Sequence, residues 1–195
     1  WRDKEIKFEW GQLKIVAGGK LIIENATVIG SSNWIDEPLI QVESGGELFI
    51  SKSKIVANPP ESYLAISVNE GGKITIRDSE IKKLGGSFGG EIGIHIQSDN
   101  AVILNSQLQE NQAAIYIQRG SGHVIKDNTI SKGHFGLFVI GTPLNSQIEN
   151  NHVSKIADDF LNSLIPIDLN IAHKISKLSL FRQRNKNGTQ IKQAR

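Results

Sequence analysis

Three ring-bearing residues, His95, Tyr116 and Phe138, occupy the same place in three short segments that are otherwise aliphatic. Each ring stands between two aliphatic residues: Ile94 and Ile96, Ile115 and Ile117, Leu137 and Val139. Aromatic rings pack on the apolar faces of sugars, and amide and guanidinium groups hydrogen-bond sugar hydroxyls. The segments therefore predict a polysaccharide-binding surface, whose candidate substrate-binding residues are His95, Gln97, Tyr116, Gln118, Arg119 and Phe138.

A catalytic site is harder to assemble from this sequence. Glycoside hydrolysis requires two carboxyl groups about 5 to 9.5 Å apart across one groove, and a calcium-dependent lyase needs several acids around a hard cation. The carboxylates here are scattered over the predicted strands and turns, so no catalytic residue is assigned. If the protein is instead a polysaccharide lyase, hydrolase or epimerase, the best candidates are Asp99, Arg119, Asp127 and His134.

The sequence indicates no metal centre and no other cofactor. It has no cysteine, and its five histidines do not stand at the spacings of metal-binding motifs. Calcium is expected only with the enzyme alternative, because converging carboxylates would have to hold it. His123 falls on an inward position of the repeat described next, so we expect it to be a buried structural residue.

A repeat positions all of these residues. A short aliphatic segment followed by an Asn, Asp or Ser turn recurs at spacings of 27, 26, 27, 22 and 23 residues, and its last aliphatic residues are Ile23, Ile50, Ile76, Ile103, Ile125 and Ile148. A second aliphatic pair precedes each copy, and a single aliphatic residue follows each turn. Alternation with period two between turn residues is typical of strands. Each repeat is therefore predicted to be three short strands joined by bends.

Repeats of this size predict a solenoid. A unit of 22 to 27 residues cannot bury its inward face alone, whereas stacked units share one aliphatic column. The predicted fold is all-β: a right-handed, single-stranded parallel β-helix of about six coils over residues 1–156, with residues 1–12 as a candidate N-terminal cap. The segment 157–195 is predicted to cover an apolar outer face or to cap the last coil, because open coil ends expose strand edges.

The bends have a signature of their own. Asn, Asp, Lys or Ser follows each of the six aliphatic positions by two or three residues, and Asn and Asp tolerate the left-handed backbone conformation. Gly-Gly pairs at 18/19, 45/46 and 71/72 predict another corner, where the backbone needs positive φ or approaches a neighbour closely. Both patterns follow from coil geometry and need no ligand.

Parts of the repeat resemble known β-helices. GGKLIIENATV and GGKITIRDSEI resemble the first coils of archaeal and bacterial surface β-helices. GIHIQSDNAVILNSQLQENQAAIYIQRGSGHVIKDNTISKGHFGLFVIG is similar to the carbohydrate-binding and sugar-hydrolase repeats of the pectate-lyase-like superfamily, a branch of which includes periplasmic accessory proteins of nitrous oxide reductase. The resemblance covers residues 13–156 and implies the fold. The catalytic motifs of the superfamily's galacturonases and epimerases are not matched here.

Charge is unevenly distributed along the chain. Residues 169–195 hold seven basic and no acidic residues, so the remaining 15 basic and 20 acidic residues give residues 1–168 a charge of −5. A negative body argues against nucleic acid as a partner. No apolar run reaches the roughly 18 to 20 residues that a membrane span needs. Because the chain starts at Trp1 and has no Met, neighbouring domains of a longer chain are expected partners.

Together these patterns favour a non-catalytic module, extracellular, on the cell surface or periplasmic, that binds polysaccharide or glycoconjugate along its outward aromatic and amide face. The enzyme named above remains an alternative. A second alternative is a structural rod or assembly unit of a surface protein. The rod predicts that the aromatic side chains are buried and that the coil ends contact other molecules.

Overall fold

In the computed structural model of this protein, the described residues are 1–9, 11–31, 40–57, 65–85, 93–140 and 143–156. Within these ranges the chain forms nineteen β-strands and no helix, and the strands make three parallel sheets. The all-β class predicted from the repeat is therefore confirmed. The segment 157–195, predicted to be a cover or a cap, lies outside the described residues.

The three sheets are defined by the following strands. Sheet 1 comprises β2 (Leu13–Ile15), β5 (Ile40–Val42), β8 (Ile66–Val68), β11 (Ile94–Ile96), β14 (Ala113–Ile117) and β17 (Phe135–Val139). Sheet 2 comprises β3 (Lys20–Glu24), β6 (Glu47–Ser51), β9 (Lys73–Arg77), β12 (Val102–Leu104), β15 (Val124–Lys126) and β18 (Gln147–Glu149). Sheet 3 comprises β1 (Glu5–Glu9), β4 (Thr27–Ser31), β7 (Lys54–Ala57), β10 (Glu80–Lys82), β13 (Gln107–Gln109), β16 (Thr129–Ser131) and β19 (His152–Ser154).

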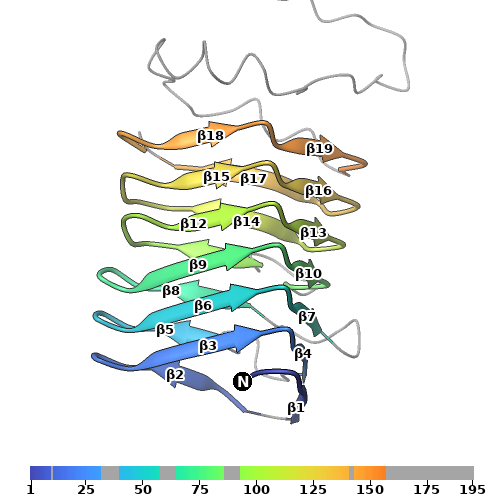
Figure 1. Cartoon of the computed structure of the whole chain (residues 1–195). Helices are drawn as coiled ribbons and strands as arrows, with labels where there is room; N and C mark the ends of the chain where they lie inside the picture. Colours follow the sequence, from blue (N-terminus) through green and yellow to red (C-terminus); the bar gives the residue numbers. More distant parts are fainter. Residues whose placement is uncertain (10, 32–39, 58–64, 86–92, 141–142, 157–195) are drawn as a thin grey trace, which may run out of the picture.

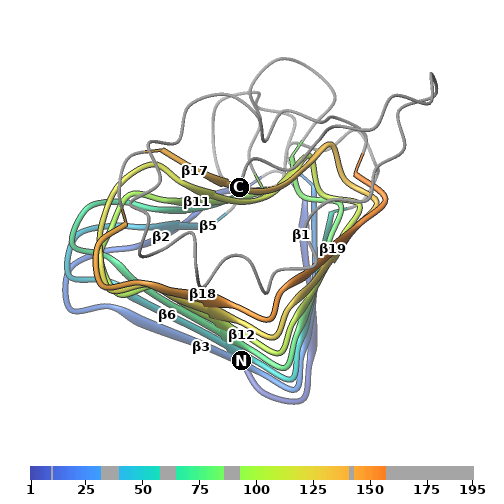
Figure 2. The ribbon, with the colours of Figure 1, turned by 90° about the horizontal axis from the view of Figure 1, so that it is seen from above.

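The chain visits the sheets in a fixed order, which makes it a solenoid. Six successive triplets, from β2–β3–β4 to β17–β18–β19, lie one above the other along a single axis (Figure 1). Viewed along that axis, the coils superimpose in a roughly triangular outline with one sheet on each side (Figure 2). The described strands thus agree with the prediction of about six coils.

The inward positions form one aliphatic core. Ile23, Ile50, Ile76, Ile103 and Ile125 are in register from β3 to β15 and have no exposed surface, while Ile148 in β18 is 8% exposed. Burying one such side chain contributes about 1.5 to 3 kcal/mol. Because every coil places its isoleucines on those of the next coil, the stack stabilises units that could not fold singly.

The corner between sheets 2 and 3 is built from left-handed residues and a buried polar ladder. Each bend has a residue with φ between 47° and 57°: Asn25, Lys52, Asp78, Asn105, Asp127 and Asn150. In every bend but the first, the next residue points inward and accepts a hydrogen bond from a backbone N–H of the coil before it. The acceptors are Ser53, Ser79, Ser106, Asn128 and Asn151, at 2.9 to 3.2 Å. The recurring turn residues of successive coils therefore stack on one another at this corner.

The glycine corner between sheets 1 and 2 shows both effects expected of it. Gly18, Gly45 and Gly71 have φ of 75°, 74° and 77°. Gly46 is required for a different reason, because a Cβ atom there would lie 2.3 Å from the carbonyl oxygen of Ile15 in the coil below. A side chain at position 46 would push two coils apart.

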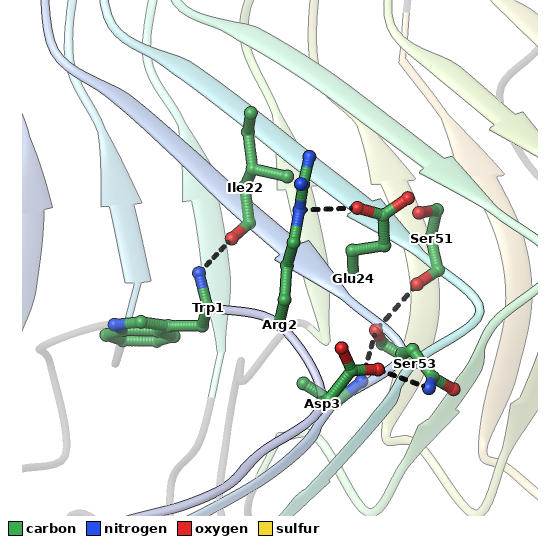
Figure 3. Close-up of polar contacts among 9 residues, drawn as sticks. Trp1, Arg2, Asp3, Ile22, Glu24, Ser51 and Ser53 are labelled. Atoms are coloured by element: carbon green, nitrogen blue, oxygen red, sulfur yellow. Dashed lines mark hydrogen bonds and ion pairs between the residues drawn. The ribbon is translucent and has the colours of Figure 1, made fainter.

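Residues 1–9 add a partial coil below the first complete one. The N-terminal ammonium donates to the carbonyl oxygen of Ile22 at 2.7 Å, Arg2 forms an ion pair with Glu24 at 2.7 Å, and the Asn25 amide donates to Asp3 at 2.6 Å (Figure 3). Strand β1 then pairs with β4. The Trp1 ring packs on Phe8 with centroids 5.5 Å apart, and both rings lie against the core.

Candidate functional site

The predicted aromatic residues meet on the outer face of sheet 1. Parallel pairing places His95 of β11 beside Tyr116 of β14, and Tyr116 beside Phe138 of β17. All three side chains are partly exposed. The alternation that buries Ile94, Ile96, Ile115 and Ile117 turns the residue between each pair outward. We call this outer surface of sheet 1, with the residues that directly follow its strands, the aromatic face.

The rings stack mainly on one another. The His95 and Tyr116 centroids are 5.0 Å apart with an interplanar angle of 17°, and the Tyr116 and Phe138 centroids are 5.3 Å apart at 34°. The first pair is stacked and the second is tilted, and at these centroid distances the rings are offset and cover one another only in part. The inner ring faces are therefore partly covered, and a ligand meets mainly ring edges along the row.

Two amides beside the rings form a hydrogen-bonded cluster with His95. The Gln97 amide nitrogen donates to Gln118 Oε1 at 2.6 Å, and the same oxygen lies 2.8 Å from His95 Nε2. These bonds are satisfied together when His95 Nε2 carries the hydrogen and Gln118 Oε1 accepts twice. Among the described residues, no hydrogen bond then uses Gln97 Oε1, Gln118 Nε2 or the Tyr116 hydroxyl.

The local environment keeps His95 neutral. Partial burial against the sheet lowers the pKa of the His95 imidazole, and the nearby Arg119 charge lowers it further, while the bond to Gln118 acts in the opposite direction. Because the ordinary pKa is 6.5 and this one is lower, most of the imidazole is uncharged at pH 7.

Arg119 lies at the margin of the aromatic face. Its guanidinium is 3.6 Å from the Glu70 carboxylate, and the two side chains are 57% and 84% exposed. An ion pair this exposed contributes little to stability. It does, however, compensate the charge of Arg119 locally.

The four catalytic candidates do not meet in the structure. Asp99 lies between β11 and β12 and Arg119 between β14 and β15, so both are on the corner joining sheets 1 and 2. Asp127 follows β15 on the corner joining sheets 2 and 3, and His134 precedes β17 on the third corner. Asp99 itself accepts hydrogen bonds from the Ser121 backbone N–H at 2.7 Å and hydroxyl at 3.0 Å. The triangular cross-section therefore keeps Asp127 and His134 on corners away from Asp99 and Arg119.

A metal site does not emerge from the described residues either. No group of three or more His, Asp or Glu side chains there is arranged to hold a cation. His123 is fully buried, as its inward position predicted, and its Nδ1 accepts a hydrogen bond from the Ala101 backbone N–H at 3.3 Å. Its Nε2 has no partner within the described ranges, and burial lowers the pKa of this imidazole.

A polar groove that the sequence analysis did not identify runs along the corner between sheets 2 and 3. It encloses about 590 Å³ and is lined by the left-handed residues of four coils and by the residues two positions later, among them Lys52, Lys54, Asp78, Glu80 and Gln107. The recurring turn residues were its only sequence signal. Glu80 forms ion pairs with Lys54, at 3.5 Å, and with Lys82, so its charge is already compensated.

The fold and the row of rings define a parallel β-solenoid with one outward face of rings and amides. The chain matches the family described as the right-handed β-helix region over residues 38–165, and it belongs to this family. The predicted right-handedness is thereby confirmed. No curated protein and no solved structure gives a significant match. Among the residues that the structure describes, no helix has the length and apolar character of a membrane span.

Proposed function

We propose that this protein is a non-catalytic β-helix module that binds polysaccharide or glycoconjugate along the aromatic face. The observation that carries the proposal is the continuous row of His95, Tyr116 and Phe138 beside two amides on one partly exposed surface. A sugar polymer lying along the solenoid axis would meet one ring per coil, at the strand spacing of about 4.8 Å.

The mutual packing of these side chains supports binding in a specific way. Ordering a long side chain on association costs about 0.5 to 1.5 kcal/mol. Here Tyr116 is already held between His95 and Phe138, and Gln97 is held by Gln118. Little rotamer freedom remains to be lost, so edge contacts and hydroxyl hydrogen bonds of modest strength suffice for binding.

The finer assignment is part of the same proposal. We place the chain in the pectate-lyase-like superfamily, in the branch of carbohydrate-binding and sugar-hydrolase repeats, and we expect it outside the cytoplasm, in the periplasm or on the cell surface. The similarity of residues 93–141 to that branch, within a resemblance to β-helices over residues 13–156, supports this placement. The separation of Asp99, Asp127 and His134 over three corners favours binding over cleavage.

The test is migration through native gels that contain neutral or acidic polysaccharides, followed by measurement of polymer length. Tyr116→Ala and Phe138→Ala are expected to abolish retardation that the wild type shows, because each removes a ring from the row. Phe49→Ala is the matched control, since Phe49 is a partly exposed ring on the outer side of β6 in sheet 2. Equal retardation of all variants would contradict the proposed face, and shortened polymer would show that the module is an enzyme.

The structural rod is the second candidate, and one observation favours it. The rings pack on one another and Gln97 bonds Gln118, as they would if the row served only to hold the coils together. In that case Tyr116→Ala lowers the unfolding temperature and no polymer retards the wild type. A rod also predicts end-to-end association in solution, which sedimentation at increasing protein concentration measures.

A further inference from the structure

The charges around the aromatic face are few and mostly compensated. Two rows of outward side chains run across the six strands of sheet 1. The first row is Lys14, Gln41, Ser67, His95, Tyr116 and Phe138. The next outward row reads Val16, Glu43, Asn69, Gln97, Gln118 and Ile140, and Glu70 and Arg119 directly follow it. Between Glu70 and the end of β17 these two rows carry no charged side chain.

Among the residues that the structure describes, each charged side chain next to the rings already has a partner. Arg119 lies 3.6 Å from Glu70, and Glu43 accepts a hydrogen bond from the Asn69 amide at 2.9 Å. Lys14 belongs to β2, three strands away from β11, or about 14 Å at the strand spacing. The centre of the face therefore offers neutral donors and acceptors, with two carboxylates and one compensated guanidinium at its margin.

We infer that the aromatic face selects uncharged, hydroxyl-rich polysaccharides and discriminates against polymers that carry a carboxylate on every sugar. The inference rests on the proposed function and names the ligand class of the same surface. Sugar hydroxyls can pair with Gln97 Oε1, Gln118 Nε2 and the Tyr116 hydroxyl.

Next to the rings, the carboxylates of a uronate polymer would find no unengaged positive charge to pair with among the described residues. Each carboxylate would lose part of its hydration without gaining an unengaged cation, and desolvating a charge without a partner is costly. Capture by Arg119 would require breaking its ion pair with Glu70, which would leave that carboxylate facing the polymer. Like charges one coil apart lie within the screening length of about 8 Å at physiological salt, so the repulsion persists there.

The experiment uses pairs of polymers that differ in charge alone. Polygalacturonate and alginate are each compared with their carboxyl-reduced forms, in which every uronate has become a neutral hexose of the same linkage, and a neutral β-glucan is added. The full chain is titrated at 150 mM salt. Because residues 169–195 carry a charge of +7 and attract any polyanion, the quantity compared is the part of the binding that Tyr116→Ala removes.

We expect this Tyr116-dependent affinity to be at least tenfold higher for the neutral member of each pair that binds. Glu70→Gln is expected to narrow the preference about threefold or more, because it releases Arg119 for a carboxylate. Glu149→Gln is the matched control: Glu149 forms an ion pair with Lys126 at 3.5 Å on sheet 2 and should leave the preference unchanged.

The possible outcomes distinguish a failure of the neutral preference from a failure of the proposed polysaccharide binding. Tyr116-dependent binding that is equal or tighter for the uronates overturns the neutral preference and leaves the proposed binding face intact. Binding to no polymer, or binding that Tyr116→Ala never weakens, overturns both. Uronate binding that survives Tyr116→Ala, together with neutral binding that does not, supports the inference and assigns the uronate binding to a surface other than the aromatic face.

Discussion

At the scale of single residues, the members of the aromatic face hold one another in place. Tyr116 has a ring on each side, at 5.0 and 5.3 Å, and Gln118 Oε1 serves both Gln97 and His95. Stacking of a sugar on a whole ring face is therefore expected mainly at the two ends of the row. Along the row, recognition depends on ring edges and amide groups.

His123 provides a prediction about pH. Its buried imidazole has a lowered pKa, so the folded protein binds fewer protons there than the unfolded chain. Stability from this group is complete above the ordinary value of about 6.5 and is lost as pH falls below it. Urea unfolding at pH 7.5 and 5.5 is expected to show a wild-type loss at the lower pH that His123→Leu reduces.

Two comparisons make this test specific. His95 also has a lowered pKa, so part of the acid-dependent loss remains in His123→Leu. His152→Gln alters an exposed histidine of β19 and should follow the wild type. An unchanged pH dependence in His123→Leu would show that this side chain does not titrate with unfolding.

At the scale of strands and corners, the polar ladder inside the solenoid helps to fix the register in which the coils stack. Asn128 accepts from the Ser106 backbone N–H and donates to Ile103 O and Asn151 Oδ1, each at 2.9 Å. Three coils are tied together by this one amide. Such a ladder sets the register of the stack, because shifting any coil breaks several buried bonds at once.

Asn128→Ala should lower the free energy of unfolding by about 2 to 4 kcal/mol, since it leaves buried backbone groups without partners. Asn128→Ser is expected to cost less, because serine fills the equivalent position at 53, 79 and 106 and still accepts the backbone N–H. Urea midpoints of the two variants are compared. Equal losses would show that accepting the Ser106 backbone N–H contributes nothing that a serine hydroxyl restores.

Three Gly→Ala substitutions are expected to give a graded series of stability losses. Gly46→Ala should cost about 2 to 4 kcal/mol because the new Cβ atom would overlap the Ile15 carbonyl at 2.3 Å. Gly18→Ala has open space but a φ of 75°, so about 1 to 2 kcal/mol is expected from backbone strain. Gly11→Ala has neither problem and should stay within about 0.5 kcal/mol of the wild type. Any other order of the thermal midpoints contradicts this account of the corner.

At the scale of the whole molecule, stability is nearly a sum over neighbouring coils, and the ends need protection. At the N-terminal end, Trp1 and Phe8 lie on the core and β1 pairs with β4. Charged residues flank the strand, since Arg2, Asp3, Lys4 and Glu5 are exposed. Charge along an edge opposes pairing with another molecule.

Deleting residues 1–9 is expected to lower the thermal midpoint and to promote association, because it bares the core and the edge of β4. Light scattering on a sizing column measures the mass. The double change Lys4→Ala and Glu5→Ala is the control, since it keeps the partial coil and removes two charges of opposite sign. A deletion variant that stays monomeric and equally stable would show that residues 1–9 do not cap the solenoid.

The spacing of residues along the chain was enough to predict the coils. The arrangement of side chains on the aromatic face could be seen only from the contacts between coils. Period-two alternation determined which residues face inward, because a strand turns successive side chains to opposite sides; Ile23, Ile50 and His123 are all buried as predicted. The sequence does not show that the rings of His95 and Tyr116 cover each other, or that Glu70 compensates Arg119 from 49 residues away. It also does not show that Asp99, Asp127 and His134 fall on three different corners. These facts depend on coil length and on side-chain packing across the stack, which residues far apart in the chain set jointly.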